Sequence, residues 1–275
     1  MMVGELAGRV ALITGGSRGI GRGAAEALAA QGAAVIVHGL DMAEAETVAA
    51  EIAAGGAMAV GIGGPIDNAT TMAAAVDLAR ERFGQLDMLV ASAGIQRYGD
   101  AVSTTPAQWA EVMAVNVTGV YLAAHYALPL IRKSPTGALV IVASVQGHAT
   151  QNQVLSYTAG KGALHAMTRA MAVDEAAYGV RVNSISPGSV DTPMLRASAA
   201  EHCDGTAEGV ERVLSEWGTA HALGRIATPA EVGAAIAFLC GPGAAFVTGA
   251  DLRVDGGLTA RLAAPLPGNK QESTA

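Results

Sequence analysis

The sequence has few cysteines, few aromatic side chains and few charges, and each shortage excludes something. Cys203 and Cys240 are the only two cysteines in 275 residues, and they lack a metal-binding spacing, so we expect reduced thiols. Aromatic residues make up only 4%, which predicts an aliphatic core of the kind found in buried parallel sheets. The net charge of -7 argues against nucleic acid or an anionic membrane as partner.

The sequence also lacks an unbroken apolar run of membrane length. Glu5 and Arg9 precede the first apolar run, so we expect no signal peptide. The two longest uncharged stretches, 112–131 and 232–250, are interrupted by polar residues, proline or glycine, and neither is expected to span a membrane. These features predict a soluble, cytoplasmic protein.

Short β-branched runs alternate with alanine-rich helical stretches along the chain. Strands are expected at 9–14, 33–38, 57–62, 86–92, 138–144, 180–186 and 250–255. Helices are expected at about 19–31, 42–54, 69–83, 106–132, 153–177 and 229–240. This alternation predicts an α/β fold, a doubly wound Rossmann-type parallel sheet of about seven strands with helices on both faces.

No linker rich in proline or serine divides the sequence. Residues 1–260 are therefore expected to form a single dinucleotide-binding catalytic domain. Residues 189–223 are more polar and weakly periodic, as expected of an active-site lid. Residues 261–275 are expected to form a flexible tail.

A glycine-rich turn, TGGSRGIG, follows the first expected strand and opens the next helix at residues 14–21. Glycines at this place let a pyrophosphate approach backbone N–H groups at the positive end of a helix. The spacing G-x-x-x-G-x-G differs from the general G-x-G-x-x-G fingerprint. The turn therefore favours a dinucleotide-binding site, but on its own it does not indicate which reaction the protein catalyses.

A second motif, LSYTAGKGALHAM at 155–167, places Tyr157 and Lys161 one helical turn apart on the same face. Their glycine and alanine neighbours leave room for a flat ligand. An isolated pair of this kind is usually a solvated helix face. A nearby cation favours the ionised form of a phenol, so we expect Lys161 to bring the pKa of Tyr157 toward neutrality.

Taken together, these motifs resemble the short-chain dehydrogenase/reductase family, in its single-domain form, over roughly residues 7–258. The further matching positions are Ser144, thirteen residues before Tyr157, Asn116 in VNVTG, SPGSVDTP at 186–193 and VDGG at 254–257. Each pattern is common by chance, but the whole set in register is not. In two places the chain departs from the family: Ala91 begins an A-S-A-G stretch where N-N-A-G is common, and Pro65 stands where an Asp is usual.

The resemblance implies a catalytic set of Asn116, Ser144, Tyr157 and Lys161. Tyr157 would be the proton donor, and Lys161 would tune it while holding the nicotinamide ribose. Ser144 would hydrogen bond to the substrate oxygen, where charge develops. Asn116 would anchor a water chain that supplies protons to Lys161.

The resemblance also implies an NAD(P) cofactor held by the glycine turn and by the residues that follow the second, third, fourth and sixth strands. The expected cofactor-binding residues are Gly15, Ser17, Arg18, Gly19, Ile20, Gly21, His38, Gly39, Leu40, Ile66, Asp67, Ser92, Ala93, Gly94, Tyr157, Lys161, Pro187, Gly188, Val190 and Thr192.

NADP(H) is the expected preference, with NAD(H) as the alternative. An NAD-selective relative would carry an acidic residue at the position aligned with Gly39, where this chain has no carboxylate. Arg18 could hold a 2′-phosphate through paired hydrogen bonds, and His38 could add a donor. Leu40 and Asp41 count against this preference, the first because many NADP-type relatives have arginine there.

The implied function is the interconversion of a ketone and a secondary alcohol, similar to bacterial 3-oxoacyl-[acyl-carrier-protein] reductases, so an acyl thioester is one candidate substrate. An NAD(H)-dependent polyol or sugar dehydrogenase and a non-catalytic dinucleotide-binding sensor are the alternatives. Helices 106–132 and 153–177 carry few polar residues, and in the family these helices pair across a two-fold axis. We therefore expect a homo-oligomer, most simply a tetramer.

The remaining candidates rest on position alone. The six histidines show no metal-binding spacing, so no metal is expected. An acidic carrier protein could contact Arg132 and Lys133, although cations are also common at a helix C-terminus. Candidate residues of the substrate pocket are Gln96, Arg97, Tyr98, Gln146, His148 and Gln153.

Overall fold

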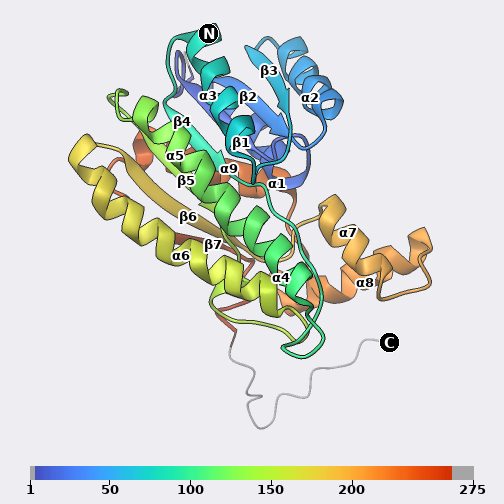
Figure 1. The fold of residues 1–275 in the computed structure, drawn as a ribbon. Helices are drawn as coiled ribbons and strands as arrows, with labels where there is room; N and C mark the ends of the chain where they lie inside the picture. The colour runs from blue at the N-terminus through green and yellow to red at the C-terminus, as the bar shows by residue number, and fades with distance from the viewer. Residues whose placement is uncertain (1–3, 262–275) are drawn as a thin grey trace.

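The structure of the protein is a computed structural model that describes residues 4–261, so the expected tail lies outside the described residues except for Arg261. Seven strands form one sheet in the order β3-β2-β1-β4-β5-β6-β7. All neighbouring strands pair in parallel, which confirms the predicted sheet (Figure 1). The strands are β1 (Val10–Thr14), β2 (Ala34–Gly39), β3 (Ala59–Gly63), β4 (Met88–Ala91), β5 (Ala138–Val142), β6 (Arg181–Pro187) and β7 (Asp251–Val254).

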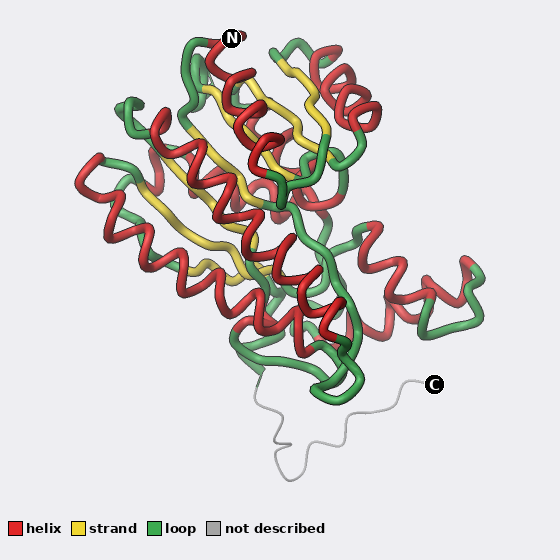
Figure 2. Tube along the Cα trace, viewed as in Figure 1, coloured by secondary structure: helices red, strands yellow, loops and turns green. Residues whose placement is uncertain are grey.

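Helices cover both faces of this sheet, as Figure 2 shows. One face carries α1 (Gly19–Ala30), α2 (Met42–Ala54) and α9 (Pro229–Cys240). The other carries α3 (Ala69–Phe83), α5 (Gly119–Ile131) and α6 (Leu155–Glu175), and α5 continues α4 (Pro106–Met113).

The core is split into two layers by the alternation of side chains along each strand. On β1, Ala11 and Ile13 pack toward α1 and α9, whereas Leu12 packs toward α3 and α5. Both layers consist mainly of Ala, Val, Leu and Ile, in agreement with the low aromatic content. The hydrophobic effect therefore acts on both faces of the sheet, which holds its carboxyl edge in place.

Two helices begin with the same kind of N-terminal cap. Thr105 caps α4 and Thr228 caps α9, each in a reciprocal capping box with the residue three positions on and with a proline at the first helical position. Each box satisfies backbone N–H groups that a helix start leaves open. These signals account for the close agreement between expected and observed starts at 106 and 229.

The structure departs from expectation in two segments. The helix expected at 106–132 is interrupted by one π-helical turn, Ala114–Thr118. The segment 189–223, in which weak periodicity was expected, contains α7 (Pro193–Ala200) and α8 (Ala207–Ala220), which project beyond the sheet in Figure 1. These helices pack around a small cluster of Ala199, Val213 and Leu214. The expectation of weak periodicity is wrong for α8, where Val210, Val213 and Trp217 recur at helical spacing.

The helical stretch Pro106–Ile131 is long and apolar enough to cross a membrane by length and composition. Half of its most apolar window is buried inside the fold, however. Residues of α5 such as Val120, Ala123 and Ala127 belong to the core layer against the sheet. Burial within the protein is a sufficient reason for its composition.

The contact between α1 and α9 gives a test of this packing. A Cβ on Gly233 would lie 2.3 Å from the carbonyl oxygen of Gly23, a backbone atom that cannot rotate away. We expect Gly233→Ala to lower the free energy of unfolding by about 1–3 kcal/mol through overpacking, measured by urea denaturation. As a control, Gly162→Ala in α6 adds a Cβ with 3.7 Å of clearance and is expected to be neutral or stabilising. Equal effects of the two substitutions would contradict the close contact.

Candidate active site

The carboxyl ends of the central strands open into a cavity of 1280 Å³. It lies where the strand order reverses between β1 and β4, the position at which open parallel sheets bind ligands. This volume exceeds the roughly 300–1,000 Å³ of a typical small-molecule pocket, so it accommodates a dinucleotide together with a substrate.

The glycine turn forms one wall of this cavity. Gly15 has a φ of +65°, and a Cβ there would lie 2.8 Å from the Cα of Ala93. A Cβ on Gly21 would lie 2.1 Å from the carbonyl oxygen of Gly15. Arg18 precedes α1 without a side-chain cap, so the first N–H groups of the helix remain available to a ligand. The turn therefore fits a pyrophosphate, which needs close backbone approach and free N–H donors.

Thr14 fixes the opposite wall. Its hydroxyl oxygen accepts hydrogen bonds from the backbone N–H groups of Ser92 (3.1 Å) and Ala93 (3.4 Å), which joins the turn after β4 to the end of β1. Only backbone groups of this turn take part in the tie. The departure at Ala91, which is buried in β4, leaves that arrangement intact.

Three of the four expected catalytic residues line the cavity: Ser144, Tyr157 and Lys161. Ser144 follows β5, and its hydroxyl oxygen accepts a hydrogen bond from the backbone N–H of Gln146 at 3.1 Å. Lys161 is 4% exposed, and its Nζ donates to the carbonyl oxygen of Val142 at 2.8 Å. The same Nζ lies 5.5 Å from the centroid of the Tyr157 ring. A proton donor, a hydrogen-bond donor and a cation therefore meet at one place.

The expectation that Lys161 brings the pKa of Tyr157 toward neutrality is wrong for the protein on its own. Burial raises the pKa of Tyr157 to about 12, although the side-chain hydrogen bond with Ser144 acts in the opposite direction. Burial also lowers the pKa of Lys161 to about 8, because no carboxylate within the described part of the chain pairs with Lys161 to offset its desolvation. Desolvation thus dominates at both groups.

The side chain of Asn116 holds the loop after β4. It is 1% exposed and does not line the cavity. Oδ1 accepts a hydrogen bond from the N–H of Ile95 and Nδ2 donates to the carbonyl oxygen of Ile95, both at 2.8 Å. This pair of hydrogen bonds engages both ends of the amide and ties the π-helical turn to that loop. The expected role of Asn116 in a water chain stays a prediction.

The adenosine end of the cavity is formed after β2. His38 is 2% exposed, and neither ring nitrogen has a hydrogen-bond partner among the described residues; burial lowers the pKa of His38. Leu40 is 78% exposed and lines the cavity. Gly39 does not line it, because a Cβ there would meet the hydroxyl of Ser17 at 2.7 Å, so Ser17 covers this position.

Arg18 is paired, which the sequence did not reveal. Its Nε donates to Oε2 of Glu44 at 2.8 Å, and its Nη2 contacts the other carboxylate oxygen. Glu44 lies in the first turn of α2 and also lines the cavity. From the sequence, Glu44 is explained by its place near a helix N-terminus, where acidic residues are common, so its pairing with Arg18 could not be predicted.

All the expected cofactor-binding residues except Gly39 line the cavity. Sequence reasoning missed several others, among them Glu44, Met194, Leu195, His221 and Arg261. His221 is buried, donates from Nδ1 to the carbonyl oxygen of Asp255 at 2.6 Å and accepts from the N–H of Ser189 at 3.4 Å. A lone histidine carries no sequence signal for such hydrogen bonds.

The expected substrate-pocket residues divide into two groups. Gln96, Tyr98 and Gln146 line the cavity. Arg97, His148 and Gln153 do not: Arg97 pairs with Glu111, His148 hydrogen bonds to Asp251, and Gln153 points to Asp100. For these three residues the expectation is wrong, because each has a protein partner outside the cavity.

An aromatic contact joins the lid helices to the pocket. The ring of Tyr98 meets His202 edge-on at a centroid distance of 5.6 Å, and His202 meets Trp217 at 5.8 Å. Tyr98 and Trp217 both line the cavity. Aromatic side chains of α8 and of the loop after β4 therefore line this end of the cavity.

His148, His165 and Asp251 come together although their spacing suggested nothing. Their ligand atoms lie within 4.8 Å of one another. The two imidazole rings stack with centroids 3.9 Å apart and planes at 16°, however. An imidazole nitrogen binds metal in its ring plane, so two nearly parallel rings do not converge on one ion. The contacts present are hydrogen bonds, from His148 to Asp251 and between His165 and Ser186.

The comparison with known proteins agrees with this geometry. The family model described as enoyl-(acyl carrier protein) reductase matches residues 15–259. The chain is 38% identical over 259 residues to 2-(S)-hydroxypropyl-CoM dehydrogenase 3 of Xanthobacter autotrophicus, covering 94% of this chain and 100% of that protein. It is 39% identical over 256 residues to L-fucose dehydrogenase of Rattus norvegicus, covering 93% and 91%. The chain belongs to the short-chain dehydrogenase/reductase family.

A solved structure supports the same assignment. Ligand-free aldohexose dehydrogenase of Thermoplasma acidophilum matches with a TM-score of 0.88 at 32% identity, over 96% of this chain and 99% of that one. The family resemblance is therefore confirmed, and this short-chain dehydrogenase/reductase is an NAD(P)-dependent enzyme that acts on CH–OH groups. Its likeness to 3-oxoacyl reductases holds at the level of the family alone.

The buried Lys161 makes a testable contribution to the pH dependence of stability. Its pKa is about 8 in the folded enzyme, against 10.5 for the ordinary value, so between these pH values the unfolded chain holds more protons. The contribution of Lys161 to stability therefore rises with pH across this window. We expect wild type to gain about 3 kcal/mol of unfolding free energy relative to Lys161→Met between pH 8 and 10.5. Chemical denaturation of both proteins at several pH values measures the difference, and a constant difference would contradict the burial of this amine.

Proposed function

We propose that the enzyme is a dehydrogenase of a small hydroxylated compound, a sugar, a polyol or a hydroxyalkyl substrate, which it interconverts with the ketone or lactone. The observation that carries this proposal is the meeting of Ser144, Tyr157 and Lys161 at the floor of one cavity. The names of the relatives, which include hydroxypropyl-CoM, fucose and aldohexose dehydrogenases, support the substrate class. The catalytic set also makes a non-catalytic sensor the weaker alternative.

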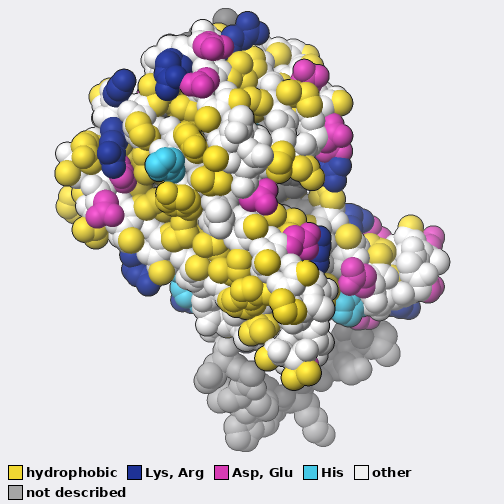
Figure 3. All heavy atoms as spheres, viewed as in Figure 1, with side chains coloured by type: hydrophobic (Ala, Val, Ile, Leu, Met, Phe, Trp, Pro, Cys, Tyr) yellow, Lys and Arg dark blue, Asp and Glu magenta, His cyan; other side chains and the backbone are white. Residues whose placement is uncertain are grey.

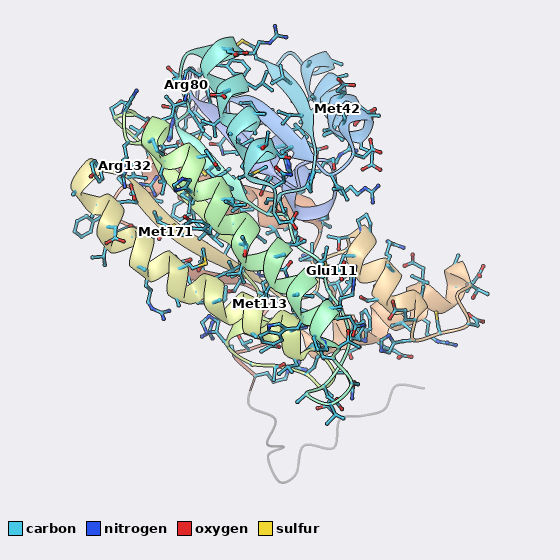
Figure 4. All side chains as sticks on the ribbon, in the orientation of Figure 1. Met42, Arg80, Glu111, Met113, Arg132 and Met171 are labelled. Atoms are coloured by element: carbon cyan, nitrogen blue, oxygen red, sulfur yellow. The ribbon has the colours of Figure 1, made fainter. Side chains whose placement is uncertain are left out.

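The 3-oxoacyl reductase activity stays a prediction. Arg132, a candidate contact for an acidic carrier protein, lies at the end of α5 (Figure 4). Its guanidinium donates to both carboxylate oxygens of Glu175, at 2.8 and 2.7 Å, and stacks over Tyr178 at 4.0 Å. A side chain engaged in this way offers little to a carrier, which favours the smaller substrates.

The residues of this chain supply proton transfer and orientation. The nicotinamide, when bound, supplies or takes the hydride. Ser144 donates a hydrogen bond to the substrate oxygen and stabilises the charge that develops there. Tyr157 gives its phenolic proton to that oxygen during reduction and takes one back during oxidation. Lys161 places a positive charge beside the phenol, and the lid excludes water from the reacting atoms.

The NADP(H) preference also stays a prediction. The absence of a carboxylate at Gly39 supports it, and so does the position of Arg18 on the cavity wall. The ion pair of Arg18 with Glu44 and the nearby Asp41 oppose it. Asp67, two residues after the Pro65 that replaces the family's usual Asp, lines the cavity together with Ile66.

We further propose that residues 1–260 act as one catalytic domain, that the enzyme works in the cytoplasm and that it assembles as a homotetramer. Hydrophobic side chains gather across the surface formed by α4, α5 and α6 in Figure 3. Trp109, Tyr121 and Val173 are exposed there. A surface of this kind on a stable protein favours burial against another subunit.

A substrate panel tests the function directly. We expect sugars, vicinal diols and hydroxyalkyl compounds to be oxidised with NAD(P)+, followed at the nicotinamide absorbance, with kcat/KM at least ten-fold above that for reduction of 3-oxoacyl thioesters. Thioester reduction as the fastest reaction would restore the 3-oxoacyl assignment. Cofactor binding without turnover of any alcohol or ketone would favour the sensor.

Removing the phenolic oxygen tests the mechanism. We expect Tyr157→Phe to lower kcat by about 10²–10⁴-fold, because general acid–base catalysis contributes that much, while cofactor binding is retained. Tyr178→Phe, which changes an exposed tyrosine outside the cavity, is the matched control and should keep full activity. Normal turnover in a folded Tyr157→Phe enzyme would refute the assignment.

The assembly is tested by light scattering during size exclusion. We expect a mass about four times that of the 27.5 kDa chain at micromolar concentration. Val173→Glu, which places a charge on the exposed apolar surface of α6, should shift the enzyme toward smaller species. A monomer for wild type is the result that rules the tetramer out.

A further inference from the structure

The adenosine end of the cavity holds an ion pair of one cationic residue, which attracts a phosphate, and one anionic residue, which repels it. Arg18 comes from the glycine turn and Glu44 from the first turn of α2, and both line the cavity beside Leu40 and Asp41. Nε and Nη2 of Arg18 both point at the carboxylate of Glu44. The guanidinium therefore presents its forked edge to Glu44 instead of to the cavity.

This place is where the two nicotinamide dinucleotides differ. The adenine ribose binds at the end of β2, where an acidic residue accepts the 2′-hydroxyl of NAD(H) and a nearby arginine accommodates the 2′-phosphate of NADP(H). In this chain β2 ends at Gly39, which offers no carboxylate. The charged residues that the glycine turn and residues 40–44 contribute to the cavity are Arg18, Asp41 and Glu44, and of these only Arg18 is positive.

The pair is weak enough to be exchanged by a ligand. Both side chains are substantially exposed, 62% for Arg18 and 38% for Glu44, and exposed pairs contribute little to stability. A 2′-phosphate can therefore take the guanidinium, but Glu44 then remains as an unpaired carboxylate close to a doubly charged group. A unit charge about 6 Å from such a group in water changes binding by on the order of ten-fold before screening by salt.

Asp41 differs from Glu44 in what it holds. Its carboxylate caps α2 by accepting from the backbone N–H of Glu44 at 3.2 Å, so its removal would disturb the helix start. Glu44 is not the capping residue, and its described side-chain contacts are those with Arg18. The charge of Glu44 can be removed without loss of the cap.

We infer that Glu44 is a specificity-determining residue of the cofactor site: it competes with the 2′-phosphate for Arg18 and holds down the affinity for NADP(H). NAD(H), which lacks the phosphate, leaves the ion pair in place and is indifferent to it. The inference rests on the proposed function only in requiring that a nicotinamide dinucleotide binds in the cavity. No turnover is needed for it to hold.

Equilibrium binding tests the inference. NADPH and NADH are titrated separately into wild type and Glu44→Gln, with the fluorescence of Trp217 in the cavity and of the reduced nicotinamide as readouts. We expect the Kd of NADPH to fall about five-fold or more in the variant, while that of NADH changes less than two-fold. The gain should shrink as salt is raised, because it is electrostatic.

The chain offers a matched control. Glu51 lies on the same helix and pairs with Arg22 at 2.9 Å, but neither residue lines the cavity. Glu51→Gln removes the same charge from α2 and should leave both affinities unchanged. Arg18→Ala should weaken NADPH binding, and adding Glu44→Gln to it should give a smaller gain than in wild type, because the repulsion between Glu44 and the phosphate is then relieved but no ion pair has to be broken.

The outcomes separate this inference from the proposed function. An equal gain in Glu44→Gln and Glu51→Gln, or no gain in either, would overturn the role of Glu44 while leaving a cofactor-binding enzyme. Weaker NADH binding in Glu44→Gln would show that Glu44 holds the ribose hydroxyl itself, which also overturns the competition. If neither dinucleotide binds wild type, both the proposed function and this inference fail.

Discussion

The hydrogen bond from the Nζ of Lys161 to the carbonyl oxygen of Val142 joins the helix that carries Tyr157 to the end of the strand that precedes Ser144. A buried ammonium is costly without an acceptor, so this bond fixes α6 against β5 at one height. The position of α6 along β5 matters because Ser144 follows β5, whereas Tyr157 and Lys161 lie on α6, and the three side chains must meet in one cavity. The cavity keeps its shape because the two aliphatic core layers hold the same strands from both faces. The arrangement of the catalytic side chains therefore depends on the hydrogen bond between Lys161 and the carbonyl oxygen of Val142.

Local pattern explains how far the sequence could predict this fold. β-branched runs and threonine–proline caps are short-range signals, and they placed all seven strands and the helices against the sheet to within about two residues. The helices α7 and α8 of the segment 189–223 were not predicted. The sequence did carry a signal for α8, because Val210, Val213 and Leu214 recur at helical spacing.

The site followed a similar division. The family resemblance predicted most of the side chains that line the cavity, because strand ends and the glycine turn fix backbone position. Spacing could not predict the contacts that these side chains make. Asn116 hydrogen bonds to Ile95, Arg18 pairs with Glu44, and Arg97 pairs with Glu111. The partners are too far apart in the sequence for a local pattern to indicate them. Desolvation was equally invisible in the sequence, so the effect of Lys161 on the phenol was overestimated.

The π-helical turn at Ala114–Thr118 lets side chains before and after it face directions that a regular α-helix could not provide together. Each residue of an α-helix advances the chain by about 100°, so one added residue rotates everything before it relative to everything after it by that amount. On one side of the turn, Val120 and Ala123 of α5 must point at the sheet. Within the turn, Asn116 must point at Ile95, in the loop after β4. A regular helix would satisfy one of these directions and miss the other, so deleting a single residue here would uncouple the core from the loop without removing any side chain that either of them uses.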